Sequence, residues 1–497
     1  MLFNSAEFLI FFPIVTLVYF LIPQKVKWVW LLLASYYFYM CWNPKYALLM
    51  AASTVITYLS GVLIAKANKN PDKKRAARAK KLTVAASFLS NLGILVFFKY
   101  SGFLTDSVNA LLHFFGKSAV MPRFDVVLPV GISFYTFQAL SYTMDVYRGE
   151  IQAEKNPFRY ALFVSFFPQL VAGPIERSKN LLIQLHEEHH FSFIRAKRGL
   201  LLMLWGFFEK LVIADRAAIL VNQVYNHHTD YGGLELALAT VLFALQIYCD
   251  FSSYTDIARG AAEVMGFSLM KNFEEPYFAK TIAQFWRDWH ISLSGWFRDY
   301  LYIPLGGNKR GQARKYFNIM VVFLASGLWH GANWTFVIWG LLHGIYQVAG
   351  GMTLSARKQL SNIFRIDRNT HAYHLFQRAI TFLLVCFGWI FFRANSVSDA
   401  FGIVRKIFCK WDPWILSGGG LTALGLSGAD LNILIFGAAV LFCVSAAHYY
   451  HIQLRNTFLK NHLVFRWAFL FAAIFFILIF GIYGPGFEES QFIYFQF

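Results

Sequence analysis

The sequence has few charged side chains. Only 14% of its 497 residues are charged and 57% are hydrophobic, whereas a soluble chain carries about 25% charged residues. This shortage excludes a soluble globular protein. Apolar runs of roughly 17–25 residues, each long enough to cross a bilayer, recur along the whole chain. Together with a mean hydropathy of +0.46, these runs predict a polytopic membrane protein.

Cysteine is also scarce. The five cysteines are scattered and no two of them form a CxxC pair, so the sequence predicts neither a disulfide framework nor a cysteine metal site. The HEEHH run at 186–190 does not have the HExxH spacing of zinc peptidases. We therefore expect no metal ion, and we expect no bound cofactor.

Acidic side chains are in deficit, with 27 Asp and Glu against 45 Lys and Arg and a net charge of +18. Such an excess can indicate nucleic-acid binding, but here it is most concentrated in the loop Lys66–Lys81, between two apolar spans. The positive-inside rule places this loop in the cytoplasm and Met1 outside. No basic n-region precedes the first apolar run, which predicts a retained helix. We expect membrane lipid, and no nucleic acid, as a partner.

The apolar runs predict an all-α fold, because the short alternating strands of a membrane barrel are missing. We expect about eleven to thirteen membrane helices, with interfacial and re-entrant pieces, in a single integral membrane domain over 1–497. The clearest spans are 6–22, 28–42, 45–65, 82–103, 199–224, 233–254, 376–393, 430–450 and 463–484.

Four other segments carry more specific expectations. Residues 105–124 form a polar stretch outside the membrane. In 158–177, two prolines and a glycine break a helix, either as the kinked wall of a pore or as a simple helix end. Residues 273–316 are amphipathic and aromatic, as in helices at the cytoplasmic interface. The apolar run 317–351 is too long for one span, and its glycines predict close helix packing or a reversal.

Two histidines stand in tryptophan-rich and nearly uncharged sequence: His290 in FWRDWHISLSGWFRDYLYIPLGG and His330 in FLASGLWHGANWTFVIWGLLHG. An ionisable residue in such a segment is a functional-site hypothesis. A neutral His330 in a dry cavity could take a proton from a hydroxyl nucleophile. The alternative is a histidine that hydrogen-bonds neighbouring helices together. The pairing with His290, and the flanking Trp329 and Asn333, favour a site.

These two segments closely resemble the membrane-bound O-acyltransferase superfamily, and most of all its bacterial branch of alginate O-acetyltransferases and teichoic acid D-alanyl transfer proteins. LPVGISFYTFQALSYTMDVYRG, FFPQLVAGPIER and YCDFSSYTDIARG resemble the same branch, in the same order. The resemblance implies a ring of membrane helices around a funnel or tunnel. It also implies that His330 is the essential histidine of the WHG motif and that His290 is the second, supporting one.

The activity implied is acyl transfer from a thioester, either acetyl-CoA or an acyl carrier, with His330 as general base and hydrogen-bond donors on the oxyanion. Six further residues are candidates for lining the tunnel or binding the donor: Trp286, Arg287, Arg298, Trp329, Asn333 and Asp250. The arginines could attract donor phosphates, although positive-inside anchoring explains them equally well. Structural pairing is the favoured alternative for Asp250, and packing for Trp286.

The C-terminal tail, residues 486–497, is apolar and aromatic, whereas frayed tails are usually polar. It resembles an aromatic motif of this branch or of its small partner proteins, in which a tyrosine is thought to carry the acyl group. On that resemblance we expect Tyr494 to accept acetyl and to pass it to a secreted or membrane-anchored SGNH-type transferase. The alternative is an interfacial aromatic anchor.

The leading prediction is an enzyme of the bacterial inner membrane. It moves acetyl groups from a cytoplasmic thioester to hydroxyls of an extracytoplasmic polysaccharide, such as alginate or a cell-wall polymer. Within the same family, the alternative is transfer of D-alanyl or longer acyl groups. An alternative from a different functional class is a transporter or polysaccharide export channel with a histidine proton relay. That reading predicts inverted repeats, and the sequence contains none that we can recognise.

Overall fold

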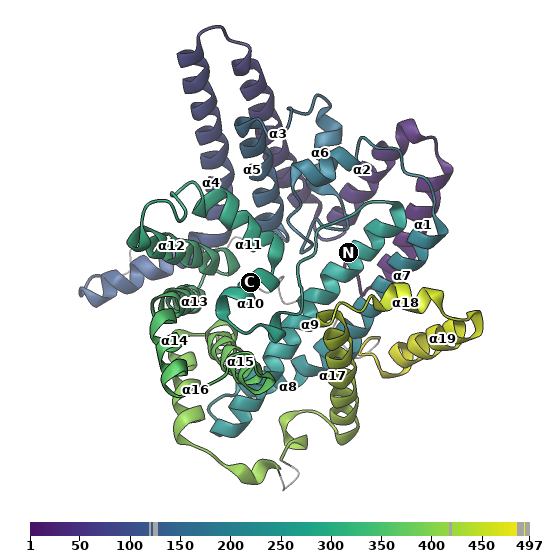
Figure 1. Cartoon of the computed structure of the whole chain (residues 1–497). Coiled ribbons are helices and arrows are strands. Elements are labelled where there is room, and N and C mark those ends of the chain that lie inside the picture. The colour runs from purple at the N-terminus through teal and green to yellow at the C-terminus, as the bar shows by residue number, and fades with distance from the viewer. Residues whose placement is uncertain (119–120, 123–127, 417–419, 485–491, 493–497) are drawn as a thin grey trace. The chain divides into compact units, whose positions relative to one another are not determined.

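The computed structural model of the chain describes residues 1–118, 121–122, 128–416, 420–484 and 492. Within these ranges the regular structure is helical, apart from one isolated bridge between Phe273 and Trp289 (Figure 1). The predicted all-α fold is confirmed.

The first helices are α1 (Ala6–Leu21), α2 (Gln24–Met40), α3 (Pro44–Asn68), α4 (Lys73–Phe114), α5 (Ile132–Arg148), α6 (Pro157–Ser165), η1 (Ser178–Leu182), α7 (Phe193–Phe208), η2 (Glu209–Ala214), α8 (Asp215–Asn226) and α9 (Gly233–Met265), where η marks a short π- or 3-10 helix. The next are η3 (Pro276–Phe278), α10 (Ile282–Asp288), α11 (Ile291–Phe297), η4 (Arg298–Tyr302), α12 (Gln312–His330), α13 (Trp334–Met352), α14 (Leu354–Ile363) and α15 (His371–Arg393). The last are α16 (Val397–Cys409), η5 (Pro413–Leu416), η6 (Thr422–Leu424), α17 (Gly428–Tyr449), α18 (Leu454–Lys460) and α19 (Leu463–Phe480).

Six helices in the described part of the chain are long and apolar enough to cross a membrane: α3, α4, α9, α15, α17 and α19. The protein is a multi-pass membrane protein, as predicted. Six is fewer than the eleven to thirteen membrane helices expected. Helices α2 and α5, with 17 residues each, are slightly too short, and polar side chains lower the mean hydropathy of α12 and α13. The expected eleven to thirteen membrane helices stay a prediction.

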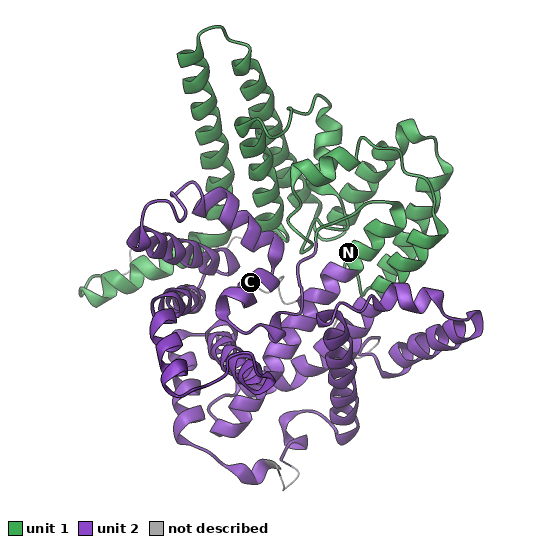
Figure 2. Cartoon of the chain, viewed as in Figure 1, with its two compact units in different colours: residues 1–203, 257–270 green, residues 204–256, 271–497 purple. Residues whose placement is uncertain are grey.

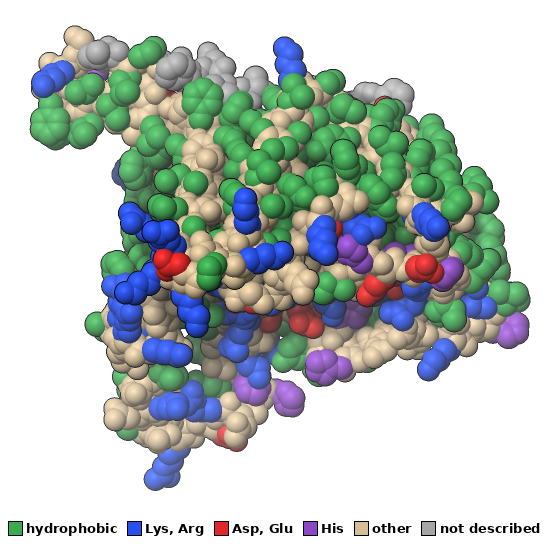
Figure 3. All heavy atoms as spheres, turned by 90° about the horizontal axis from the view of Figure 1, so that it is seen from above, with side chains coloured by type: hydrophobic (Ala, Val, Ile, Leu, Met, Phe, Trp, Pro, Cys, Tyr) green, Lys and Arg blue, Asp and Glu red, His purple; other side chains and the backbone are tan. Residues whose placement is uncertain are grey.

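The surface has the distribution that a membrane protein requires. On the face drawn in Figure 3, hydrophobic side chains cover a broad area and Lys and Arg side chains gather in a separate band. Large apolar side chains are exposed on α19, among them Val464, Trp467 and Ile479. Exposure of this kind is stable only against lipid or another apolar surface.

The chain forms two compact units, residues 1–203 with 257–270 and residues 204–256 with 271–497 (Figure 2). In unit 1, α3 packs against α4 and α5. Gly61 of α3 permits this approach, since a Cβ there would lie 2.6 Å from the Tyr142 hydroxyl.

Helix α4 of unit 1 continues beyond its predicted apolar span, 82–103. The polar stretch predicted from residue 105 is helical as far as Phe114, because α4 runs through 42 residues. It ends just before Gly116, whose φ of 72° is the left-handed conformation that commonly closes a helix. Isolated polar residues such as Asn109 are therefore carried within the helix.

The proline-rich break in 158–177 is a helix end. Helix α6 ends three residues before Pro168, and the chain that follows is buried although it is not helical. Side chains satisfy its freed backbone groups. Gln138 Nε2 donates to the Phe163 carbonyl over 2.6 Å, and Ser35 Oγ accepts from the Phe167 N–H over 3.1 Å. Irregular backbone at membrane depth needs such internal partners.

In unit 2, the reversal predicted within 317–351 is confirmed. Helices α12 and α13 form a hairpin that turns at residues 331–333. A Cβ on Gly327 would overlap the Phe336 carbonyl, and a Cβ on Gly340 would overlap the Phe323 carbonyl. Glycine therefore allows the two backbones to pack closely, and the hairpin holds His330 at its turn.

Candidate active site

His290 lies between α10 and α11 in unit 2, in a strained backbone conformation. Its φ of 44° and ψ of 54° are left-handed, which is uncommon for a residue other than glycine. Two hydrogen bonds to Asn272 fix the residues that follow. The Ile291 N–H donates to the Asn272 carbonyl over 2.9 Å, and the Ser292 N–H donates to Asn272 Oδ1 over 3.3 Å. Strain of this kind costs about 1–3 kcal/mol and concentrates at functional sites.

The imidazole of His290 is completely buried. It lies outside the six long apolar helices, and burial lowers its pKa from 6.5 to about 3. Desolvation disfavours the charged ring, so the ring is neutral near pH 7. A neutral imidazole has one donor and one acceptor nitrogen.

His330 is the last residue of α12 and is 4% exposed. Its ring lies 6.4 Å from the His290 ring, and Trp329 contacts both, at 5.0 Å from His330 and 5.7 Å from His290. Trp339 and Phe392 contact the His330 ring at 5.0 Å and 5.3 Å between centroids. We call these five residues the histidine centre. The aromatic rings are themselves buried, so His330 lies in the interior of the unit and not on a lipid-facing surface.

Gly331, the last residue of the tryptophan–histidine–glycine triplet, has no room for a side chain. A Cβ on Gly331 would overlap the Phe336 ring. The Phe336 ring meets Phe392 at 4.9 Å, and Phe392 packs against His330. The space left by Gly331 is therefore part of what sets the position of the His330 ring.

Replacing Gly331 with Ala is expected to destabilise the protein by about 1–3 kcal/mol, the usual penalty for overpacking, and to lower acyl transfer. Gly350 of α13 is the matched control, because a Cβ there meets nothing within 4 Å. Thermal unfolding of purified protein measures the first effect. A Gly331→Ala variant as stable as Gly350→Ala would contradict the steric argument.

Asn333 and Trp329 have different surroundings. Trp329 belongs to the histidine centre. Asn333 caps α13, because its Oδ1 accepts from the Thr335 N–H over 3.0 Å and its Nδ2 donates to the Asn395 carbonyl over 3.3 Å. The asparagine thus fixes the turn that follows His330.

Sequence reasoning missed a third buried histidine, His343 of α13. Trp286 Nε1 donates to His343 Nδ1 over 3.1 Å. An indole nitrogen can only donate, so Nδ1 accepts and the neutral ring carries its proton on Nε2. Trp339 contacts both His343, at 5.1 Å, and His330. The four-residue spacing of Trp339 and His343 in WGLLHG, one helical turn, was the signal that could have identified it.

Asp250 of α9 is held in a buried ion pair. Lys210 Nζ lies 2.6 Å from Asp250 Oδ1 and 2.9 Å from Asp215 Oδ1, and the lysine side chain is 1% exposed. Lys210 belongs to η2, a π-helical segment between α7 and α8. Such segments often mark functional sites. The geometry agrees with structural pairing for Asp250.

The two candidate arginines are exposed. Arg298 Nε lies 2.9 Å from Asp299 Oδ1, and Arg287 Nε donates to the Ala283 carbonyl of its own helix over 3.3 Å. Exposed ion pairs contribute about 0–1 kcal/mol, so this contact does little to restrain Arg298. A role for either arginine in donor binding stays a prediction.

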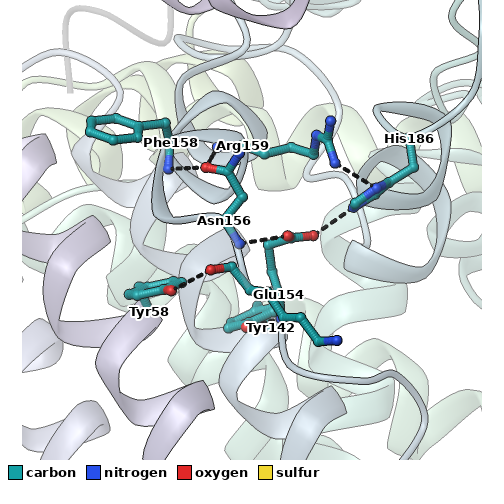
Figure 4. Close-up of polar contacts among 8 residues, drawn as sticks. Tyr58, Tyr142, Glu154, Asn156, Phe158, Arg159 and His186 are labelled. Carbon is teal, nitrogen blue, oxygen red and sulfur yellow. Dashed lines mark hydrogen bonds and ion pairs between the residues drawn. The ribbon is translucent and has the colours of Figure 1, made fainter. Parts of the chain in front are cut away.

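The HEEHH run forms a structural contact in unit 1. As Figure 4 shows, His186 lies between Arg159 and Glu154. The Arg159 guanidinium donates to Nδ1 over 2.7 Å, so the ring proton is on Nε2, which lies 2.6 Å from Glu154 Oε2. No group of three or more potential ligands that could hold a metal ion occurs among the described residues. Tyr494 lies outside the described part of the chain, as does the tail apart from Phe492.

The histidine centre lies largely within a segment that matches a known protein family. The profile of the membrane-bound O-acyltransferase family matches residues 150–386, which include both histidines of the centre. The probable alginate O-acetylase AlgI of Pseudomonas putida is 38% identical over 436 residues, covering 88% of this chain and 85% of the relative. The chain belongs to the membrane-bound O-acyltransferase family.

Two further relatives differ in the group or polymer that their names specify. The peptidoglycan O-acetyltransferase of Helicobacter pylori is 34% identical, over 82% of this chain and 79% of the relative. The teichoic acid D-alanyltransferase of Bacillus subtilis is 26% identical, over 55% of this chain and 71% of the relative. As a membrane-bound O-acyltransferase, the chain is an enzyme that requires an acyl donor. The transporter alternative is therefore set aside.

Proposed function

We propose that the protein transfers acetyl groups from a cytoplasmic thioester to hydroxyls of an extracytoplasmic polysaccharide, in the bacterial inner membrane. The observation that carries the proposal is the buried pair of His290 and His330, 6.4 Å apart, with Trp329 in contact with both. The names of the Pseudomonas putida and Helicobacter pylori relatives, which are 38% and 34% identical to this chain, support acetyl as the group transferred. They also support a polysaccharide as the acceptor.

In this proposal His330 is the general base. Its imidazole removes the proton of an attacking hydroxyl, whose oxygen forms a bond with the thioester carbonyl carbon. Collapse of the tetrahedral intermediate breaks the carbon–sulfur bond, and the imidazolium returns the proton to the leaving thiolate. His290 is a positioning residue, which keeps a neutral ring beside His330. The donor is acetyl-CoA or an acyl carrier thioester.

Hydrogen-bond donors that stabilise the oxyanion belong to the same proposal. Trp286, Trp329 and Asn333 are candidates for this environment or for the tunnel wall. Trp286 and Asn333 already make hydrogen bonds within the protein, to His343 and Asn395. Arg287 and Arg298, both exposed, could attract donor phosphates over a longer range.

Transfer to the polymer then needs a second step, for which we propose Tyr494 and an SGNH-type transferase. The Tyr494 hydroxyl accepts acetyl with His330 as base, and the resulting ester passes the acetyl group to the partner enzyme. Support comes from Phe492, two residues earlier, which contacts Tyr254 of α9 at 4.9 Å. The preceding turn of the same helix carries Phe251, which contacts His290 at 4.7 Å.

Replacing Tyr494 with Phe is expected to abolish acetylation of the polymer, because the ring remains while the nucleophilic oxygen is lost. Membranes supplied with radiolabelled acetyl-CoA or acyl carrier and the partner transferase provide the assay. Wild-type protein should also carry a labelled acetyl group that the variant lacks. Unchanged polymer acetylation in Tyr494→Phe would rule out the relay, and labelling from a D-alanyl donor instead would favour the D-alanyl alternative.

A further inference from the structure

Unit 2 contains a buried lysine that faces an aromatic ring as well as two carboxylates. The Lys210 ammonium is paired with Asp250 and Asp215, at 2.6 Å and 2.9 Å. It also lies 4.3 Å from the centroid of the Phe492 ring. A cation over an aromatic face is attracted by the quadrupole of the ring, most strongly where water is excluded.

Phe492 is enclosed from a second side. Its side chain is 1% exposed, and Tyr254 meets it edge to face, with centroids 4.9 Å apart and planes at 89°. This geometry is the favoured one for aromatic pairs. Tyr254 follows Asp250 by one turn of α9, so the ammonium, its carboxylate and the second ring come from one compact region. Burying the ammonium costs desolvation free energy, and the two paired carboxylates offset that cost.

The chain approaches η2 at a second point before it reaches Phe492. Beyond the end of α19, the Ile482 N–H donates to the Leu211 carbonyl of η2 over 2.9 Å. Arg216 Nη2 donates to the Phe480 carbonyl over 2.8 Å. Ile482 and Phe492 are therefore held by neighbouring residues of η2, Leu211 and Lys210, and Arg216 of α8 holds the end of α19.

We propose that Lys210 and Tyr254 form the docking site of the C-terminal tail, and that Phe492 is its anchor. The buried ammonium selects an aromatic side chain, and the surrounding carboxylates keep the ammonium in place. The anchor contacts Tyr254 of α9, one turn after Phe251, which contacts His290. Phe492 is thus a positioning residue for the tail, and its link to acyl transfer rests on the proposed function. The docking itself does not depend on the acyl relay.

Photocrosslinking tests the docking directly in the full-length protein in nanodiscs. With p-azidophenylalanine at position 492, irradiation is expected to attach the probe to the peptides that contain Lys210 or Tyr254. The matched control is the same probe at Phe469 of α19, which is 51% exposed and should attach to lipid. Adducts from position 492 that lie only on lipid or on other peptides would overturn the proposal.

A second measurement avoids any effect of the azido group. Loss of a desolvated cation–π contact should lower the equilibrium constant for docking about thirty-fold. Carboxypeptidase should therefore release the C-terminal residues of Phe492→Ala up to about thirty-fold faster than those of wild type, while Phe492→Trp should restore protection. Digestion of Phe492→Ala at the wild-type rate would overturn the proposal. Tyr494→Phe should leave the adducts and the digestion unchanged even if it stops acetyl transfer, so failure of the docking and failure of the relay are distinguishable.

Discussion

Replacing His330 with Gln is expected to lower acyl transfer by about 10²–10⁴-fold, the range that general-base catalysis contributes. The amide can fill much of the space of the imidazole and can hydrogen-bond, but it cannot take a proton at neutral pH. The ring contacts with Trp339 and Phe392, at 5.0 Å and 5.3 Å, would be weakened and not abolished. Insertion and folding should therefore survive.

The measurement is acetyl transfer from labelled donor in membranes, normalised to the amount of folded protein. His186→Gln is the control, because His186 is bound to Glu154 and Arg159 in unit 1 and has no part in the proposed reaction. His330→Ala should behave like His330→Gln. Acetylation at wild-type levels in both His330 variants would remove this residue from the catalytic role.

Replacing Lys210 with Met is expected to destabilise the protein by about 3–5 kcal/mol, because removing one partner of a buried ion pair leaves uncompensated charge. Here the loss is severe, since the carboxylates of Asp215 and Asp250 would face each other without the ammonium between them. Thermal unfolding in detergent should show a marked fall in Tm. The Asp250→Asn substitution in the same background should recover part of the loss by removing one charge.

Arg298→Met supplies the contrast for this experiment. The Arg298 side chain is 67% exposed in its pair with Asp299, and exposed pairs contribute about 0–1 kcal/mol. Its Tm should therefore stay close to that of wild type. If Lys210→Met unfolded at the same temperature as Arg298→Met, the buried pair would have no structural role.

Much of the fold follows from the sequence because apolar length and helix-breaking residues act locally. The hairpin of α12 and α13 was predictable from a run too long for one span, with glycines at the contact. The two histidines were identified for a similar reason, since an ionisable side chain stands out against its uncharged neighbours. The end of α6 before Pro168 follows from the steric effect of the proline ring.

The contacts between distant segments could not be predicted in this way. Lys210 and Asp250 are forty residues apart, and the basic residue alone gives no sign of its partner. The place of His343 in the site is visible only from its hydrogen bond with Trp286, which lies 57 residues earlier in the chain. The left-handed backbone of His290 depends on Asn272 in the same way. Each is decided by tertiary packing, which local patterns do not encode.

The 42 residues of α4 have a consequence for the way the protein sits in lipid. At 1.5 Å per residue this helix is about 63 Å long, roughly twice the thickness of the hydrocarbon layer. One end must stand in water, and the first nine residues, 73–81, contain six lysines and arginines. Each is worth about 1 kcal/mol near an anionic leaflet. We therefore expect the attraction of this end of α4 to the membrane surface to increase with the content of anionic lipid and to weaken as the ionic strength rises.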